Sequence, residues 1–172
     1  TLLRSTRRIG SCEGTYFDEP NRRMLLNIRN SYAKEGIALA MENKKDSALK
    51  ALNLCDKNIL EKDFPYALTS PGNMDNINSL QTVYAYYMAG DTVKAEAISN
   101  EIIQDCQQQI NFYSSLPPEK IGDLQNDQQR ASAIIQQLQA WQQLFGHINR
   151  SSELPFQIDS NAAAPDTTAA KK

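Results

Sequence analysis

Apolar residues recur at helical spacing along most of the chain, and polar or proline-bearing breaks separate the repeats. The spacing i, i+4 and i+7 appears, for example, at Ala48, Leu52 and Cys55, which places these side chains on one helix face. The pattern predicts about five helices, over residues 21–43, 47–60, 74–89, 92–115 and 127–148. We therefore expect an all-α fold built from antiparallel helical hairpins.

Start and stop signals support these boundaries. An acidic pair, Asp18 and Glu19, precedes Pro20, and proline suits a first helical turn because the N–H it lacks would be unpaired there. Asp46 is the expected N-cap of the second helix. Gly90 and Asp91 are the expected C-cap of the third helix and N-cap of the fourth.

The other segments divide the chain into one helical domain with two flanking segments. Residues 1–15 show no sustained period and are expected to form an extended lead-in, followed by the helical domain over 16–148. Within it, residues 61–73 form a loop with proline and glycine breakers, and Phe64 and Tyr66 are expected to pack back onto the core. Residues 149–172 have too little apolar content to order themselves, so they are expected to be a disordered tail.

The two helical hairpins have similar turns. Each turn places a cap residue shortly before a small alanine, Ala48 in the first unit and Ala95 in the second. This pattern resembles the tetratricopeptide repeat, in which small residues let two helices cross closely. Matching positions are Tyr32, Gly36, Leu39, Ala48, Leu52 and Cys55 in the first unit and Tyr86, Gly90, Ala95 and Ile102 in the second. The resemblance implies a short right-handed stack that the fifth helix caps.

Charge and hydropathy argue against two classes of partner. The net charge is −2, and the basic cluster Arg4, Arg7 and Arg8 is most simply a solvated tail, so nucleic acid is not an expected partner. No run of about 18 apolar residues occurs, so no part of this chain is expected to span a membrane. The chain starts at Thr1 without a methionine, and we interpret it as an excised fragment or processed product.

The three cysteines are widely spaced, at Cys12, Cys55 and Cys106. Without a CxxC or Cys/His cluster, a zinc site is not expected. Cys55 and Cys106 lie in apolar register on predicted helices, which favours buried thiols. The alternative is a disulfide between them in an oxidising compartment.

The sequence contains no recognisable catalytic motif. The single histidine, His147, lies near the end of the last helix, where it would compensate the helix dipole. We find no glycine-rich phosphate loop, nucleophile elbow or metal-spaced carboxylates, so we expect no cofactor, no metal and no enzyme activity in this chain. The glutamines are most simply a solvated or partner-facing surface: Gln107, Gln108, Gln109, Gln128, Gln129, Gln136, Gln137, Gln142 and Gln143.

A polar stripe on the first helix is the candidate binding site. Its members follow one another at steps of four, three and four, and so share one helix face: Arg23, Asn27, Asn30 and Lys34. Basic and amide side chains on one face can hold a carboxylate or an acidic peptide. The alternative is a solvated face, or pairing with the nearby acidic residues Asp18, Glu19 and Glu35.

The first helix also carries a family resemblance. The segment 16–33 and the later run 84–95 resemble the C-terminal part of a bacterial family of multi-pass membrane proteins, catalogued as a domain of unknown function and similar to protein O-mannosyltransferases. The matching residues in the first helix are Tyr16, Asp18, Glu19, Asn21, Arg22, Arg23, Met24, Asn27, Arg29 and Asn30. The resemblance implies a helical domain on the periplasmic side of the inner membrane. It also implies that the catalytic acidic residues lie in a separate membrane-embedded module.

Three functions follow from these patterns. The first is a non-catalytic protein-interaction domain of a membrane glycosyltransferase-like protein, which binds a peptide, an acceptor protein or its own membrane module. The second is a free-standing periplasmic peptide-binding adaptor. The third is a purely structural spacer that docks on the membrane module.

Overall fold

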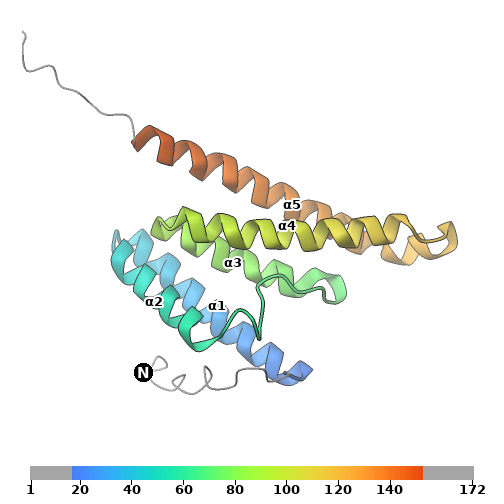
Figure 1. The fold of residues 1–172 in the computed structure, drawn as a ribbon, viewed down its shortest axis with the longest axis horizontal. Coiled ribbons are helices and arrows are strands. Elements are labelled where there is room, and N and C mark those ends of the chain that lie inside the picture. The colour runs from blue at the N-terminus through green and yellow to red at the C-terminus, as the bar shows by residue number, and fades with distance from the viewer. Residues whose placement is uncertain (1–16, 153–172) are drawn as a thin grey trace, which may run out of the picture.

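A computed structural model describes residues 17–152 of the chain, which form only helices and no strand (Figure 1). The elements are α1 (Glu19–Met41), α2 (Lys45–Asn58), the short 3-10 helix η3 (Pro71–Asn73), α3 (Met74–Ala89), α4 (Thr92–Ser114) and α5 (Pro118–Ser152). The prediction of an all-α fold with five α-helices is confirmed.

Most predicted helix ends agree with the structure because side-chain and glycine caps determine them. Asp18 caps α1 by accepting a hydrogen bond from the backbone N–H of Asn21 at 3.1 Å. Gly90 ends α3 with φ of 93°, a conformation that costs glycine little, and Asp91 caps α4. The predicted N-cap of α2 is wrong. Lys44 is the N-cap and makes no capping side-chain bond, while Asp46 lies in the first turn of the helix.

Helix α5 differs most from its predicted range. It begins at Pro118 instead of residue 127 and continues to Ser152 instead of residue 148. Pro118 and Glu119 form a favourable first turn, although the apolar pattern there is too sparse to reveal a helix. The first four residues of the expected tail are therefore helical. The predicted lead-in, with Arg4, Arg7, Arg8 and Cys12, and the remainder of the tail lie outside the described residues.

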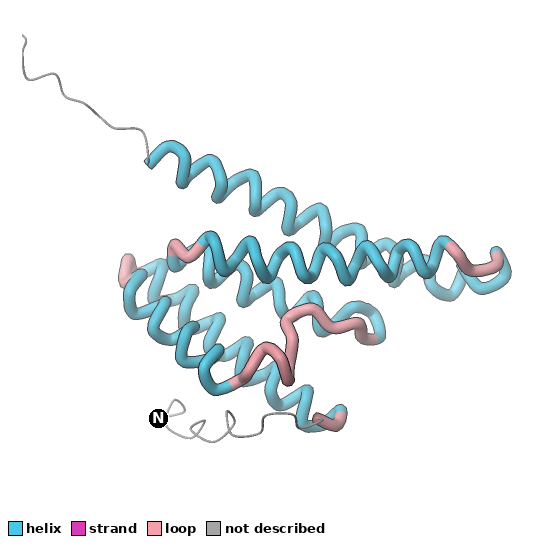
Figure 2. The backbone as a smooth tube through the Cα atoms, in the orientation of Figure 1, coloured by secondary structure: helices cyan, strands magenta, loops and turns pink. Residues whose placement is uncertain are grey.

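The helices pack side by side, but not strictly in sequence order. Helix α1 packs on α2 and most extensively on α3, α3 packs on α4, and α4 packs on α5. Figure 1 shows α5 running along α4, at the opposite end of the stack from α2. Figure 2 shows the one long connection between described helices, from α2 to η3, crossing the stack beside α3 and α4. We call residues 59–73 the crossing loop.

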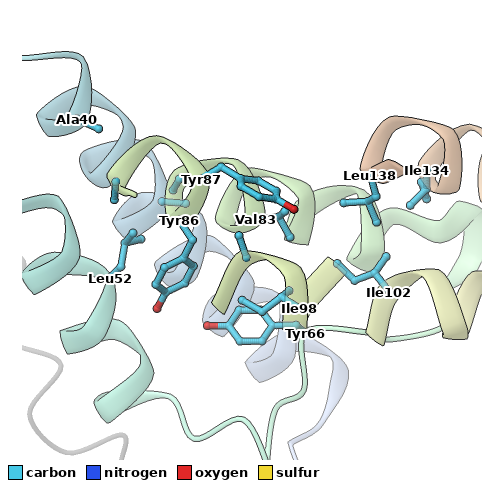
Figure 3. Packing of buried hydrophobic residues seen from close by; sticks show 14 of the residues in the cluster. Ala40, Leu52, Tyr66, Val83, Tyr86, Tyr87, Ile98, Ile102, Ile134 and Leu138 are labelled. Carbon is cyan, nitrogen blue, oxygen red and sulfur yellow. The ribbon is translucent and has the colours of Figure 1, made fainter. Parts of the chain in front are cut away.

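The core follows the predicted apolar stripes. Val83, Ile98, Ile102 and Leu138 are buried where α3, α4 and α5 meet, and Tyr86 of α3 extends the core toward Leu52 of α2 (Figure 3). The aromatic residues of the crossing loop are buried too, as predicted: Phe64 and Tyr66.

Small residues allow the closest helix contacts. Ala48 and Ala95 are fully buried, and a methyl group added at Gly36 would lie 3.1 Å from the side chain of Leu52. The close approach predicted at Gly36 is thus confirmed. Cys55 and Cys106 are buried free thiols, so the disulfide alternative is not realised.

The buried thiols and phenols predict a loss of stability at alkaline pH. Burial raises the pKa of Cys55 and of Cys106 from an ordinary 9.0 to about 12, and it also raises the pKa of Tyr66 and Tyr86. The folded state therefore keeps protons that the unfolded chain releases, so the stabilisation is complete below pH 9 and is lost as the pH rises toward 12. We expect each thiol to contribute roughly 1 kcal/mol of the loss between pH 8 and 10.

Urea unfolding followed by circular dichroism at several pH values measures this loss. The variant with Cys55→Ala and Cys106→Ala is the control, because its free energy of unfolding should depend less steeply on pH. An unchanged dependence in that variant would show that the thiols titrate alike in the folded and unfolded chain.

Candidate functional site

A groove of about 320 Å³ lies between the start of α1 and the start of α3. Helix α1 forms one wall of the groove. The end of the crossing loop and the first turns of α3 form the other wall. The lining residues are Glu19, Arg22, Arg23, Leu26, Asn27, Ser70, Pro71, Met74, Asp75 and Asn78. We call this feature the α1–α3 groove.

The structure brings two of the four predicted site residues to this groove and a third next to it. Arg23 and Asn27 line it directly. Asn30 does not line it, but its side-chain Nδ2 donates a hydrogen bond to Oδ1 of the lining residue Asn78 at 3.1 Å. Lys34 is exposed one turn farther along α1 and is not part of the lining.

Two ion pairs set the charge of the groove. Arg22 Nη2 lies 3.0 Å from Asp75 Oδ2, and Arg23 Nη2 lies 3.2 Å from Glu19 Oε1. The second pair is exposed and is one of the pairings expected as an alternative to ligand binding, so it adds little stability. Burial raises the pKa of Asp75 above its ordinary value, although Arg22 acts in the opposite direction. The lining therefore balances two positive and two negative side chains.

The sequence pattern did not identify the α3 wall of the groove. Ser70, Met74, Asp75 and Asn78 are distant from α1 along the chain, and only packing of α1 on α3 brings them opposite Arg23. Their spacing along α3 is that of a solvated helix face, which gives no local signal of a groove.

The start of α3 is held in place by its own polar contacts. Asn73 has a positive φ of 56°, which lets the chain enter the helix sharply. The hydroxyl of Ser70 accepts a hydrogen bond from the backbone N–H of Asp75 at 2.9 Å. These contacts fix the wall that faces α1.

Arg29 attaches the crossing loop to α1. Its guanidinium donates hydrogen bonds to the carbonyl oxygens of Phe64, at 2.7 Å, and Pro65, at 3.2 Å. The guanidinium carbon also lies 4.0 Å from the centre of the Tyr66 ring, within the range of a cation–π contact. Arg29 is only 2% exposed, so this charged side chain lies in the interior.

Asp105 attaches the same loop to α4. Its carboxylate accepts hydrogen bonds from Nδ2 of Asn76 and Nε2 of Gln109, both at 2.7 Å, and from the hydroxyl of Thr69 at 2.8 Å. The side-chain oxygen of Asn76 accepts a bond from the backbone N–H of Leu68 at 3.0 Å. The loop is therefore bound on both sides by buried or half-buried polar side chains.

A second polar cluster centres on Asp56. Its carboxylate accepts hydrogen bonds from two tyrosine hydroxyls, that of Tyr66 and that of Tyr86, the latter at 2.9 Å. Nζ of Lys94 lies 3.5 Å from Asp56 and 2.8 Å from Glu61. This cluster joins α2, the crossing loop, α3 and α4, which suits a structural role.

The chemistry available in the α1–α3 groove is recognition through hydrogen bonds and apolar contact. Guanidinium and amide groups lie at its rim. The 52% exposed Met74 provides most of its apolar surface, because Leu26 at its base is only 6% exposed. His147 lies in α5, a different helix from those that form the groove.

Residues 17–152 show neither a metal-binding cluster nor a helix suited to crossing a membrane. These residues place no three or more His, Cys, Asp or Glu side chains together to hold a metal ion. None of the described helices is long and apolar enough to cross a bilayer. Comparison of the chain with protein-family models, curated proteins and solved structures finds no match.

Proposed function

We propose that this chain is a non-catalytic interaction domain that binds a peptide or a protein segment in the α1–α3 groove. The observation that carries the proposal is the position of Arg23 and Asn27 on the wall of that groove, opposite the start of α3. Both side chains are exposed, and neither belongs to the buried core.

The composition of the groove suits a peptide more than a small anion. A small anion favours an excess of positive charge, whereas this lining balances Arg22 and Arg23 against Glu19 and Asp75. A peptide presents backbone donors and acceptors, which amides such as Asn27 can match, and a carboxylate on it can displace Glu19 from the exposed Arg23. Apolar side chains of the peptide would contact Leu26 and Met74.

The resemblance in the first helix supports a wider proposal. Arg22, Arg23, Asn27 and Asn30 belong both to the resembling segment and to the groove or its immediate support. We place the domain as the tetratricopeptide-like, right-handed C-terminal stack of a membrane glycosyltransferase-like protein, on the periplasmic side. Its partner would be an acceptor protein or the membrane module of the same protein.

Two other functions remain as alternatives. A free-standing periplasmic adaptor would use the same groove for a separate peptide. A structural spacer would use the surface of α1 only to dock on the membrane module, and the Arg23–Glu19 pair favours it because both charges already have a partner.

Peptide selection from a phage-displayed random library tests the groove. We expect selected peptides to bind the full chain and to lose at least about tenfold in affinity when Arg23→Ala and Asn27→Ala are combined, as expected when charge-assisted contacts are removed. The matched control combines Asn53→Ala and Lys57→Ala, an exposed amide and an exposed base at the same i, i+4 spacing on α2.

Two outcomes would count against the groove. One is equal loss of binding in the groove variant and the α2 control, which would indicate general electrostatic attraction. The other is full retention of binding by the groove variant, which would show that the groove does not bind the peptide and would favour the spacer alternative. Substitution of Asn30 is avoided because its bond to Asn78 also joins α1 to α3.

A further inference from the structure

Helix α5 carries an uncharged polar face on its solvent side. Six residues at steps of four, three, four, three and four define it, and we call it the amide face: Gln125, Gln129, Ser132, Gln136, Gln139 and Gln143. Alternating steps of three and four place them in one line along the helix, the spacing of a coiled-coil seam. All six are exposed except Ser132, which is half-buried.

This line is separate from the apolar stripe by which α5 packs on the stack. That stripe contains Ala131, Ile134 and Leu138, which are buried, with Trp141 and Phe145 packed against the core. The amide face therefore lies on the solvent side of α5, outside the packing of its own domain.

The amide face also has a shallow, open hollow. This depression of about 310 Å³ lies over the first half of the face, where Ser132 and Ala133 are small residues among the larger side chains of Gln125, Gln128, Gln129 and Gln136. In helix pairing, a side chain of one helix inserts into such a hollow on the other. The hollow is lined entirely by α5.

We propose that the amide face pairs two copies of this chain, with the two α5 helices antiparallel about a two-fold axis. A two-fold interface brings the same surface together twice, so its groups must complement themselves. A carboxylate or an ammonium group repels its own copy, whereas a side-chain amide both donates and accepts hydrogen bonds. A face of glutamines is therefore suited to meeting its own copy.

The spacing fits the antiparallel arrangement. With the axis at the level of residue 134 along the helix, Gln125 faces Gln143 of the second copy, and Gln129 faces Gln139. Ser132, the small member, faces Gln136, so the longest side chain near the axis meets the hollow. The pairing uses a different surface from the α1–α3 groove, so it does not depend on the proposed function.

The expected dimer is weak. The face from residue 125 to residue 143 spans roughly 27 Å at 1.5 Å per residue, and a single helix pair of this length buries less than the roughly 800 Å² per partner of a standard stable interface. Dimerisation should therefore depend on concentration.

Sedimentation velocity of the full chain, from about 1 to 100 µM, measures this equilibrium, since weak interfaces dissociate in that range. We expect the mass to rise from 19.3 kDa toward twice that value. Gln136→Glu places two like charges close to the axis and should weaken the dimer at least about tenfold. Gln81→Glu, the same change at an exposed position of α3, should leave the dimer unaffected.

A second substitution tests the orientation. Adding Ser132→Lys to Gln136→Glu creates two Lys–Glu pairs across the axis only when the helices are antiparallel, so the double variant should recover the dimer. A failure to recover overturns the antiparallel pairing. A mass of 19.3 kDa throughout the concentration range overturns the proposed dimer, and the amide face would then contact solvent or a different molecule. Equal weakening of the dimer by Gln81→Glu would show that the amide face does not form the interface.

Discussion

Replacing Arg29 with alanine should lower the free energy of unfolding by about 3 kcal/mol. The change leaves the buried carbonyl oxygen of Phe64 and the half-buried one of Pro65 without their donors, and an unsatisfied buried group costs about 1–3 kcal/mol. It also removes the side chain that packs on the Tyr66 ring. Urea unfolding followed by circular dichroism measures the loss.

Two companion variants separate this effect from a general loss of positive charge. Arg23→Ala on the same helix removes a guanidinium that is 76% exposed, and it should cost less than about 0.5 kcal/mol. Arg29→Lys keeps the charge but not the planar fork that reaches two carbonyls, so its loss should be intermediate. Arg29→Ala with wild-type stability would mean that the crossing loop is held by its α4 side alone.

Replacing Asp56 with alanine should cost a similar amount, roughly 3 kcal/mol. The hydroxyls of Tyr66 and Tyr86 lose their shared acceptor inside the protein, and an unmade hydrogen bond at a buried hydroxyl is expensive. Lys94 keeps Glu61 as its partner, so the cation is not isolated. Thermal and urea unfolding of the variant report the size of the loss.

The asparagine variant shows which property of Asp56 matters. Asp56→Asn retains one acceptor oxygen without the charge, so it should recover part of the stability. Asp46→Ala, in the exposed first turn of the same helix, is the control and should change little. If Asp56→Ala costs no more than Asp46→Ala, water replaces the carboxylate and the cluster is not a structural one.

Much of the fold was predictable because its boundaries are coded locally. The bond from Asn21 to Asp18 and the positive φ of Gly90 each depend on a residue whose chemistry is evident in the sequence. The start of α5 was missed because Pro118 and Glu119 are a weak signal without apolar residues behind them. Secondary structure is predictable where cap and pattern agree.

The interior polar residues were less predictable. Arg29 lies four residues after Leu25 and three before Tyr32, so it is in register with the apolar stripe, and that position is the one available sign of its burial. Its acceptors are backbone carbonyls of a loop, which no side-chain pattern reveals. The α1 wall of the α1–α3 groove could be predicted from the polar stripe. Its α3 wall could not, because only tertiary packing brings that wall opposite α1.

The crossing loop has a consequence for how this protein unfolds. The backbones of α1 and α4 do not pack closely within the described residues, yet Arg29 of α1 and Asp105 of α4 both bind the crossing loop, Arg29 at residues 64 and 65 and Asp105 at Thr69. Stacked repeats ordinarily contact only their neighbours, so an end unit can fray by itself. Here, opening the first hairpin also breaks contacts beside the second. Backbone amides of α1 and α4 should therefore exchange with solvent in one cooperative event.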